Sequence, residues 1–271
     1  MEPPKMNQIA PDLSEAELLR QDRDGVAWLT LNRPLQRNAL SVSLTRALQA
    51  ELDAIALEPA TRVVVIAGAG PAFCAGHDLR EMRATQGREF YEAVFSQSAR
   101  LMLSIVRLPK PVIARVHGVA SAAGCQLVAS CDLAVAADTA RFATPGVQIG
   151  LFCSTPMVAL SRVIGRKPAM EMLLTGDFVP AAEARALGLI NRVVPEAELD
   201  AAVQALATRI AASSPLTLAI GKEAFYQQAE MDLDAAYRYA AEVMTRNMLT
   251  HDAGEGIDAF LAKRPPIWTG S

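Results

Sequence analysis

The chain has 271 residues, of which 51% are hydrophobic, 20% charged and 5% aromatic, and its formal net charge is -3. At this length and apolar fraction, the chain can bury a core large enough to fold without disulfides or metal ions, which excludes a disordered protein. The small negative charge, without any basic run, argues against nucleic acid as a main partner.

The cysteines and histidines offer neither a disulfide framework nor a metal site. The four cysteines and three histidines lack the paired spacing that either would need. No apolar run reaches the ~20 residues of a membrane span, and the acidic N-terminal segment lacks the apolar stretch of a signal peptide. We therefore expect free thiols, no metal, no membrane partner and a cytoplasmic location.

Strands and helices alternate through the first two thirds of the chain, after a weakly ordered arm that is expected to hold one short helix from Ser14. β-Branched runs predict strands, and apolar residues at helical spacing predict helices. The alternation predicts parallel strands joined by right-handed crossovers, which is an α/β core. In chain order the expected elements are strand 26–31, a helix after the N-cap Ser41, strand 63–66, helix 88–106, strand 112–116, helix 120–130, strand 133–136, helices 156–164, 167–174 and 181–187, and strand 189–194.

The last third of the chain is expected to be helical. Amphipathic patterns cover residues 196–212, 215–229, 233–249 and 253–262. These helices have little sheet against which to pack. We therefore expect them to pack on the core or on a neighbouring subunit.

Two loops of small residues, 72–79 and 118–126, each follow a strand and open a helix. The first amides of a helix have no partner within it, and the helix dipole favours negative charge there. Two such ends that face each other would give converging N–H donors, which is how an oxyanion hole is built. The alternative is that the small residues only allow close packing between helix and strand.

Several segments, in order and at family spacing over residues 22–267, resemble the enoyl-CoA hydratase/isomerase (crotonase) superfamily. They are Asn38–Leu40, Ala72–Leu79, Lys110–Ala114, Gly124–Leu127, Ala169–Gly176 and Gly256–Pro265. The resemblance implies an α/β fold of the crotonase (ClpP-like) type, a spiral of ββα units. It divides the chain into an N-terminal arm (1–21), a spiral core with an acyl-CoA site (22–195), and a C-terminal helical region (196–271). That last region would form a homotrimer or a dimer of trimers.

The resemblance also implies a ligand and its site. An acyl-CoA thioester would bind with its carbonyl oxygen between the backbone amides of His77 and Ala123, and no cofactor beyond this coenzyme A thioester is implied. Arg37 and Lys263 are candidates for the phosphates, with a solvated surface charge as the alternative, and Asp78 has a structural alternative. The positions that correspond to substrate binding are Arg37, Ala39, Ala75, Gly76, His77, Asp78, Leu79, Gly124 and Lys263.

The chain departs from the family where hydratases carry two catalytic glutamates. Those positions correspond to Gln126 and Gly146. Glutamine cannot transfer a proton near neutral pH, and glycine has no side chain. Because each acid/base group contributes ~10²–10⁴-fold to the rate, we expect standard hydration to be weak or absent. Ser154, near the place where some relatives carry a catalytic aspartate, is a further candidate.

Three functional alternatives remain open at this point. The site could decarboxylate or hydrolyse an acyl-CoA, because decarboxylation requires only enolate stabilisation and a later proton. The protein could instead bind acyl-CoA without catalysis, as a regulatory protein. Efficient hydration would require another carboxylate, for instance Glu81 or Glu89 from the loop 81–92.

Overall fold

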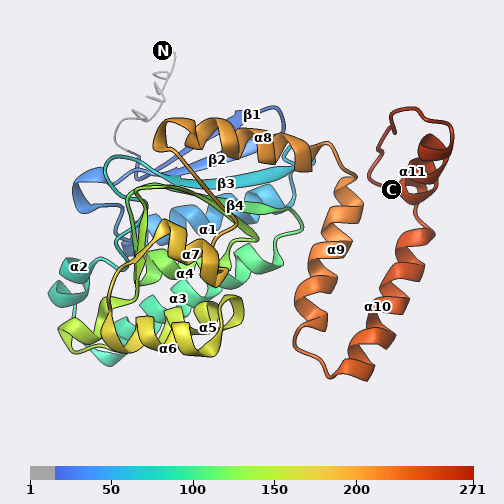
Figure 1. Ribbon diagram of the computed structural model, residues 1–271. Helices are drawn as coiled ribbons and strands as arrows, with labels where there is room; N and C mark the ends of the chain where they lie inside the picture. Colours follow the sequence, from blue (N-terminus) through green and yellow to red (C-terminus); the bar gives the residue numbers. More distant parts are fainter. Residues whose placement is uncertain (1–15) are drawn as a thin grey trace, which may run out of the picture.

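The computed structural model describes residues 16–271 and shows an α/β body from which a helical arm extends (Figure 1). The body is built on a six-stranded sheet of order β1-β2-β3-β4-β6-β9. From β2 to β9 every neighbouring pair is parallel, which confirms the predicted parallel core. The strands are β1 (Leu18–Arg23), β2 (Val26–Leu31), β3 (Val63–Gly68), β4 (Val112–Val116), β6 (Leu133–Ala137) and β9 (Arg192–Val194).

The N-terminal prediction needs a correction. Ser14 lies outside the described residues, and Leu18–Arg23 form β1 rather than a continuing helix. β1 pairs antiparallel with β2, with Leu18 opposite Leu31. The tight turn between them uses positive φ angles at Asp24 and Gly25, a conformation that favours these residue types. Part of the segment expected as an arm therefore belongs to the sheet.

Residues 16–271 form eleven α-helices, of which the first eight belong to the body and the last three form the arm. They are α1 (Val42–Ala56), α2 (Leu79–Ala84), α3 (Arg88–Arg107), α4 (Ala123–Ser130), α5 (Ser154–Val163), α6 (Arg166–Thr175), α7 (Ala181–Leu187), α8 (Leu199–Ala211), α9 (Pro215–Gln228), α10 (Leu233–Met248) and α11 (His251–Leu261). Ser41 caps α1 as predicted, and its side chain accepts the Leu44 N–H.

The central strands are apolar on both faces because helices cover both. One set of strand residues packs on α8, and the alternate set packs on α1, α3 and α4. Val63 and Val65, for example, belong to the α8 side, whereas Val64 and Ile66 belong to the other. This double cover explains why β3 is a continuous apolar run rather than an alternating one.

A second, three-stranded sheet lies beside the start of α4. It contains β5 (Val119–Ser121), β7 (Arg141–Ala143) and β8 (Val179–Pro180) in that order. The predicted helix 120–130 is therefore wrong at its beginning. Residues up to Ser121 pair with β7 instead, and α4 starts at Ala123.

The arm consists of α9, α10 and α11, and a buried ammonium group fixes α9 to the body. Lys222 Nζ donates to the carbonyls of Ile105 and Lys110, each at 2.9 Å, and to the Asp132 carboxylate at 2.7 Å. The Tyr226 hydroxyl donates to the same carboxylate at 3.0 Å. Burial lowers the pKa of Lys222, and the adjacent Asp132 opposes that effect. These two donors and three acceptors together fix α9 against the body.

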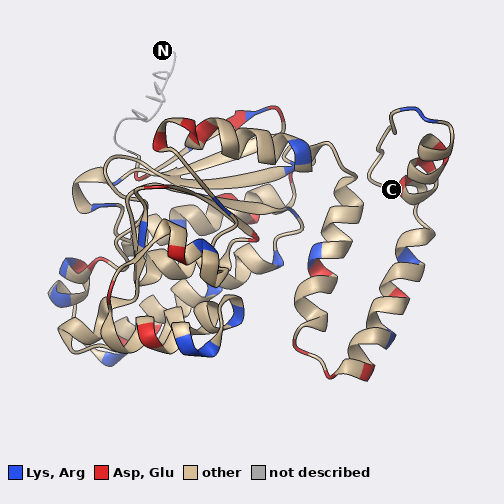
Figure 2. Ribbon diagram, in the orientation of Figure 1, with Lys and Arg blue, Asp and Glu red and all other residues tan. Residues whose placement is uncertain are grey.

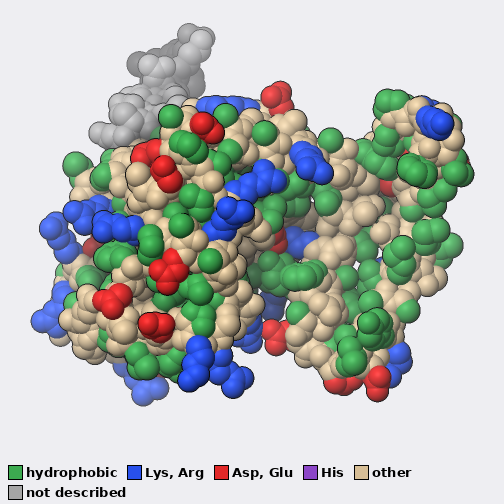
Figure 3. Space-filling view, viewed as in Figure 1, with side chains coloured by type: hydrophobic (Ala, Val, Ile, Leu, Met, Phe, Trp, Pro, Cys, Tyr) green, Lys and Arg blue, Asp and Glu red, His purple; other side chains and the backbone are tan. Residues whose placement is uncertain are grey.

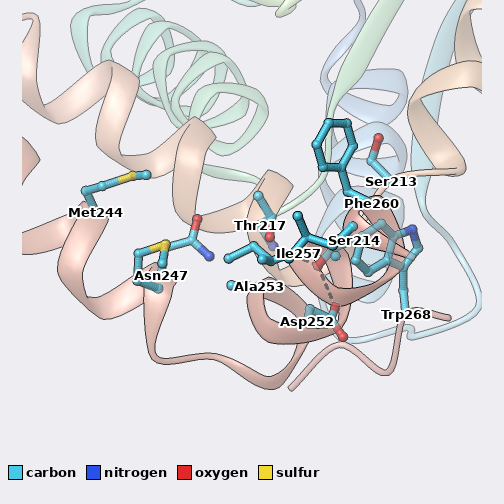
Figure 4. A pocket seen from close by; sticks show the side chains of 13 residues that line it. Ser213, Ser214, Thr217, Met244, Asn247, Asp252, Ala253, Ile257, Phe260 and Trp268 are labelled. Carbon is cyan, nitrogen blue, oxygen red and sulfur yellow. Dashed lines mark hydrogen bonds between the residues drawn. The ribbon is translucent and has the colours of Figure 1, made fainter. Parts of the chain in front are cut away.

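Apolar side chains gather on the arm in the space-filling view (Figure 3). The side chains of Tyr237, Leu249 and Phe260 are exposed by 73%, 84% and 82%. A cavity of about 440 Å³ lies among the start of α9, the end of α10 and α11, and it is lined mostly by apolar residues (Figure 4). By contrast, acidic and basic side chains are interspersed over the body (Figure 2).

A buried carboxylate joins α11 to the start of α9. Asp252 is 1% exposed and accepts from Ser214 Oγ at 2.5 Å and from Thr269 N at 2.8 Å. The Gly270 N–H also donates to it, at 3.1 Å. Burial alone would raise the pKa of Asp252, but these donors outweigh it and lower the pKa to about 2. The carboxylate thus ties the C-terminal residues to the starts of α9 and α11.

This carboxylate predicts a pH dependence of the stability of the arm. Because the folded pKa of about 2 lies below the ordinary value of 3.8, the contribution of Asp252 is complete above the ordinary value and is lost as the pH falls towards 2. We expect Asp252→Asn to lower the urea midpoint at pH 7. The difference from the unmodified protein should shrink at pH 3. A difference that is equal at both values would contradict the assignment.

Candidate active site

The loop that follows β3 is held on both sides by backbone pairing. Cys74 donates to the Val119 carbonyl at 3.1 Å and accepts from Ser121 N at 2.9 Å. On the other side, Leu40 N donates to the Gly76 carbonyl at 2.7 Å, and Asp78 N donates to the Leu40 carbonyl at 3.1 Å. Leu40 and His77 thus form a parallel bridge, in which Leu40 pairs with the carbonyl of Gly76 and the N–H of Asp78. The N–H of His77 therefore points away from Leu40.

The start of α4 is set by a strained turn. Ala122 has φ 49° and ψ −115°, and its N–H donates to the Ala143 carbonyl at 2.9 Å. A positive φ at a residue other than glycine costs on the order of 1–3 kcal/mol and persists only where surrounding contacts hold it. The next amide, that of Ala123, is the first of the helix and has no partner within it.

Two glycines let the loop and the helix approach closely. A Cβ on Gly124 would lie 2.1 Å from the Cys74 carbonyl oxygen, and a Cβ on Gly76 would lie 3.5 Å from Ala123 N. Within residues 16–271, no hydrogen-bond acceptor faces the N–H of His77 or of Ala123. The structure therefore brings together the two amides that the sequence singled out. Such paired donors stabilise negative charge on an oxygen.

Gln126 lies one helical turn further along α4. Its backbone N–H donates to the Ala122 carbonyl at 3.0 Å, and its side chain is 5% exposed. The side-chain Oε1 has no hydrogen-bond partner among the described residues. An amide in this position can hold a polar group but cannot transfer a proton.

Gly146, where the resemblance predicts the second glutamate of hydratases, is enclosed by residues 151–153. Gly146 lies in the short 3-10 helix Pro145–Ile149, and a Cβ there would lie 2.7 Å from the Leu151 carbonyl oxygen and 3.0 Å from Cys153 Sγ. Burial raises the pKa of the Cys153 thiol, although the Gly146 N–H opposes the rise, so the thiol is protonated at neutral pH. The segment 151–153 thus occupies the space in which a side chain would start.

Two of the three carboxylates near the loop, Asp78 and Glu81, bind other groups of the chain. Asp78 caps α2 through Arg80 N at 3.1 Å and pairs with Arg33 at 2.9 Å. Burial would raise the pKa of Asp78, but Arg33 and the cap donors lower it overall. Glu81 accepts the Val42 N–H at 2.9 Å, and Glu89 is exposed in the first turn of α3. Asp78 and Glu81 are thus engaged in structural contacts, and a catalytic role for Glu81 or Glu89 stays a prediction.

The predicted coenzyme A positions form one edge beside the loop, with one exception. Arg37 is exposed, and its carbonyl accepts the Ala75 N–H at 3.0 Å, while Ala39 is buried next to it. Asn38 ties this edge together, because its side-chain amide donates to the carbonyls of Ala69 and Ala72. Leu79 continues the edge and is 48% exposed.

Lys263 and Ser154 lie apart from this edge. Lys263 follows α11 on the arm, which packs on α9 and α10 rather than on the loop. Ser154 begins α5 with an exposed side chain, whose hydroxyl donates to the Phe152 carbonyl at 3.4 Å. Their roles stay predictions.

The sequence analysis did not single out two buried polar side chains that have no hydrogen-bond partner among residues 16–271, Ser98 and Thr144. Ser98 is 1% exposed and lies on the buried face of α3 with Leu101 and Met102. Thr144 is fully buried and directly precedes the 3-10 helix that contains Gly146. Ser98 could have been found from the sequence, because it interrupts an otherwise apolar helix face. Thr144 could have been found only from its position next to the segment of Gly146.

Within residues 16–271, no cluster of three or more His, Cys, Asp or Glu side chains is arranged to hold a metal ion. The same residues include no helix with the length and apolar character to cross a membrane. The four cysteines are free and buried.

Comparison with known proteins identifies the family. The Enoyl-CoA hydratase/isomerase family model matches residues 21–271, so the chain belongs to this family, and its fold is the crotonase fold. The chain is 46% identical over 251 residues to enoyl-CoA hydratase domain-containing protein 3, mitochondrial, of Xenopus laevis, a match that covers 93% of this chain and 85% of the relative. The resemblance predicted from the motifs is thereby confirmed.

Solved structures agree with this assignment. An enoyl-CoA hydratase from Mycobacterium smegmatis superposes with a TM-score of 0.92 at 53% identity, over 94% of this chain and 99% of that one. Human enoyl Coenzyme A hydratase domain-containing protein 3 gives 0.91 at 45% identity, over 93% and 100%. The relative from Xenopus is named mitochondrial, and the cytoplasmic location stays a prediction for this chain.

The closed space at Gly146 predicts a steric effect on stability. Gly146→Ala should lower the free energy of unfolding by ~1–3 kcal/mol, because the new methyl meets a backbone carbonyl that cannot rotate away. Gly254→Ala is the matched control, since nothing lies within 4 Å of its Cβ position on α11. Urea unfolding of the two variants would compare them. Equal urea midpoints for the two variants would contradict the prediction, because they would show that segment 151–153 moves aside at little cost in free energy.

Proposed function

We propose that this protein binds an acyl-CoA and polarises its thioester carbonyl between the backbone amides of His77 and Ala123, with standard enoyl hydration weak or absent. The observation that carries the proposal is the pair of free amides beside a glutamine and a closed glycine position. Membership of the enoyl-CoA hydratase/isomerase family supports the ligand class.

The chemistry follows from what the site provides. Two preorganised N–H donors stabilise an oxygen that gains negative charge when the acyl group becomes an enolate, and removal of one such donor typically costs ~3 kcal/mol of transition-state stabilisation. The α4 dipole adds to this effect. Gln126 can hold a polar group but cannot take or give a proton, so hydration lacks its acid and base. Decarboxylation of an acyl-CoA fits these residues better than hydration does.

For the coenzyme A part, we propose that it lies along the edge formed by residues 37–40 and 75–79. Arg37 is exposed at this edge and is available to a phosphate. Lys263 follows α11 on the arm, which extends away from the body that carries this edge (Figure 1). We therefore propose that Lys263 serves the site of a neighbouring copy.

We also propose a homotrimer or a dimer of trimers, in which a second copy covers the arm. The support is the exposed apolar surface of α10 and α11, which includes Tyr237, Leu249 and Phe260. Contiguous apolar surface of this kind typically marks an interaction site.

The proposed assembly predicts the molecular mass of the protein in solution. Sedimentation equilibrium should give three or six chains for the unmodified protein. Leu249→Asp together with Phe260→Asp should reduce the mass, because a charge would be buried in the interface. Leu57→Asp on the body, at a side chain that is 86% exposed, should not. A monomeric unmodified protein would contradict the proposal.

The activity proposal is tested by two measurements on one sample. We expect acetoacetyl-CoA to bind at equilibrium while crotonyl-CoA is hydrated slowly, and Gln126→Glu to raise hydration by ~10²-fold, since it restores one acid/base group. Fast hydration by the unmodified protein would overturn the argument from Gln126 and Gly146. Failure to bind would overturn the acyl-CoA site itself.

A panel of acyl-CoA substrates then separates the remaining alternatives. Release of carbon dioxide from a malonyl-type thioester would support decarboxylation. Release of free coenzyme A without loss of carbon dioxide would indicate hydrolysis. Binding without turnover across the panel would indicate a non-catalytic acyl-CoA-binding protein.

A further inference from the structure

His117 is a buried histidine whose two ring nitrogens both have hydrogen-bond partners. It follows β4 directly and is 7% exposed. Its Nε2 lies 2.7 Å from the carbonyl oxygen of Gly70, and its Nδ1 lies 2.7 Å from Nη1 of Arg115. The proposed acyl-CoA site does not itself use this ring.

The two partners determine the protonation state of the His117 ring. A guanidinium group only donates hydrogen bonds, so Nδ1 accepts one from Arg115. A carbonyl oxygen only accepts, so Nε2 carries the proton that is donated to Gly70. The ring is therefore neutral, with its single N–H at Nε2.

Three charged side chains lie near enough to act on the ring. Arg115 of β4 is paired with Asp200 of α8 at 2.7 Å, and Glu196 begins the short 3-10 helix that precedes α8. Burial, which has the largest effect, lowers the pKa of His117 together with Arg115, although the Gly70 carbonyl and the two carboxylates oppose them. A proton added at Nδ1 would face the guanidinium group and break that hydrogen bond.

The hydrogen bond from His117 lies where the two segments of the proposed site begin to run side by side. Gly70 is two residues beyond the end of β3, and His117 is one residue beyond the end of β4. At the next pair of residues, a Cβ on Gly118 would lie 2.3 Å from the carbonyl oxygen of Pro71. The two turns are thus in close contact from this point onward.

Each of the two segments then continues to one of the paired amides. Cys74 and Ala120 form a parallel bridge. His77 follows Cys74 by three residues, and Ala123 follows Ala120 by three residues. The hydrogen bond from His117 to Gly70 is therefore at the base of the contact that brings the two amides together.

Asn38 holds the same turn by independent hydrogen bonds. Its side-chain amide donates to the carbonyls of Ala69 at 2.8 Å and Ala72 at 2.7 Å. Without the bond from His117, the turn 69–72 would stay attached to Asn38 but would lose a link to the end of β4. We therefore expect a displacement of the turn rather than unfolding.

We propose that His117 is a positioning residue: its neutral ring holds the turn 69–72 against the segment 118–123, so that the amides of His77 and Ala123 point at one oxygen, and its protonation weakens thioester binding. This inference rests on the proposed acyl-CoA site. It adds a side chain that acts through the backbone rather than on the thioester itself.

Nuclear magnetic resonance of the full-length chain, labelled with ¹⁵N at its three histidines, tests the protonation state. At pH 8 we expect the His117 ring to carry a proton at Nε2 alone, and its signals are identified by their loss in His117→Gln. A proton at Nδ1 at that pH would overturn the inference, because Arg115 could then not donate to the ring.

Calorimetric titration tests the effect on the thioester. The affinity ratio of butyryl-CoA to free coenzyme A removes the titration of the phosphates, which both ligands share. Between pH 8 and pH 5.5 this ratio should follow the neutral fraction of His117, and full protonation should lower it by about tenfold, because two hydrogen bonds to the carbonyl weaken together. A ratio that stays constant while the ring becomes protonated, or that falls while the ring stays neutral, would overturn the inference.

Two variants separate the hydrogen bond from the titration. His117→Gln keeps a donor for the Gly70 carbonyl and does not titrate, so it should keep the ratio at pH 8 and show no decrease at lower pH. His117→Leu removes the donor and should lower the ratio at pH 8 by about tenfold. An unchanged ratio in His117→Leu would contradict the positioning role. A decrease with pH that persists in His117→Gln would assign it to another group, such as His77, and would also contradict the inference.

The exposed His251 on the arm supplies the matched control. His251→Gln should show the same affinity ratio and the same pH dependence as the unmodified protein. The proposed function fails separately from this inference. No binding of butyryl-CoA at any pH, or equal affinity for butyryl-CoA and coenzyme A at pH 8, would overturn the paired amides themselves, whatever the state of the His117 ring.

Discussion

The close approach of the loop 74–78 to the start of α4 is the constraint on which the site depends. Gly124 lies so near the Cys74 carbonyl that even a methyl group would collide with it, and Gly76 lies against Ala122 in the same way. The cost is visible in the positive φ of Ala122. Because the strands on either side hold both segments, the strain is retained, and the amides of His77 and Ala123 remain free of internal partners.

The same packing explains why the chemistry proposed here differs from standard hydration. Hydration needs a proton donor and acceptor at fixed positions, whereas an enolate needs only donors that point at one oxygen. The chain keeps the second requirement in its backbone, where side-chain changes have little effect. Gln126, where the resemblance predicts an acid, carries an amide whose oxygen has no partner among residues 16–271, and at Gly146 the segment 151–153 leaves no room for a side chain.

The arm differs from the body in that polar contacts attach it while much of its outer surface is apolar. Its attachment uses charged and polar groups that are fully partnered, as at Lys222 and Asp132, whereas its outer surface exposes Leu249 and Phe260 to solvent. Burial of apolar surface contributes roughly 25 cal/mol per Å², so a surface of this kind gains from contact with another chain. Lys263 follows α11 on the arm, whereas the proposed site lies in the body.

The sequence by itself determined the alternation of strands and helices, the apolar strands covered on both faces, and the absence of glutamate at Gln126 and Gly146, because local periodicity and residue identity carry this information. Tertiary structure decided the rest. β1 and β5 became strands through pairing with β2 and β7, which overrode local helical patterns. Contacts between segments far apart in the chain also decide two features of the site: which amides have no partner among residues 16–271, and that Gly146 has no room for a side chain. Whether such a contact forms depends on differences of a few tenths of an ångström in the distance between packed atoms, and no local sequence pattern encodes these differences.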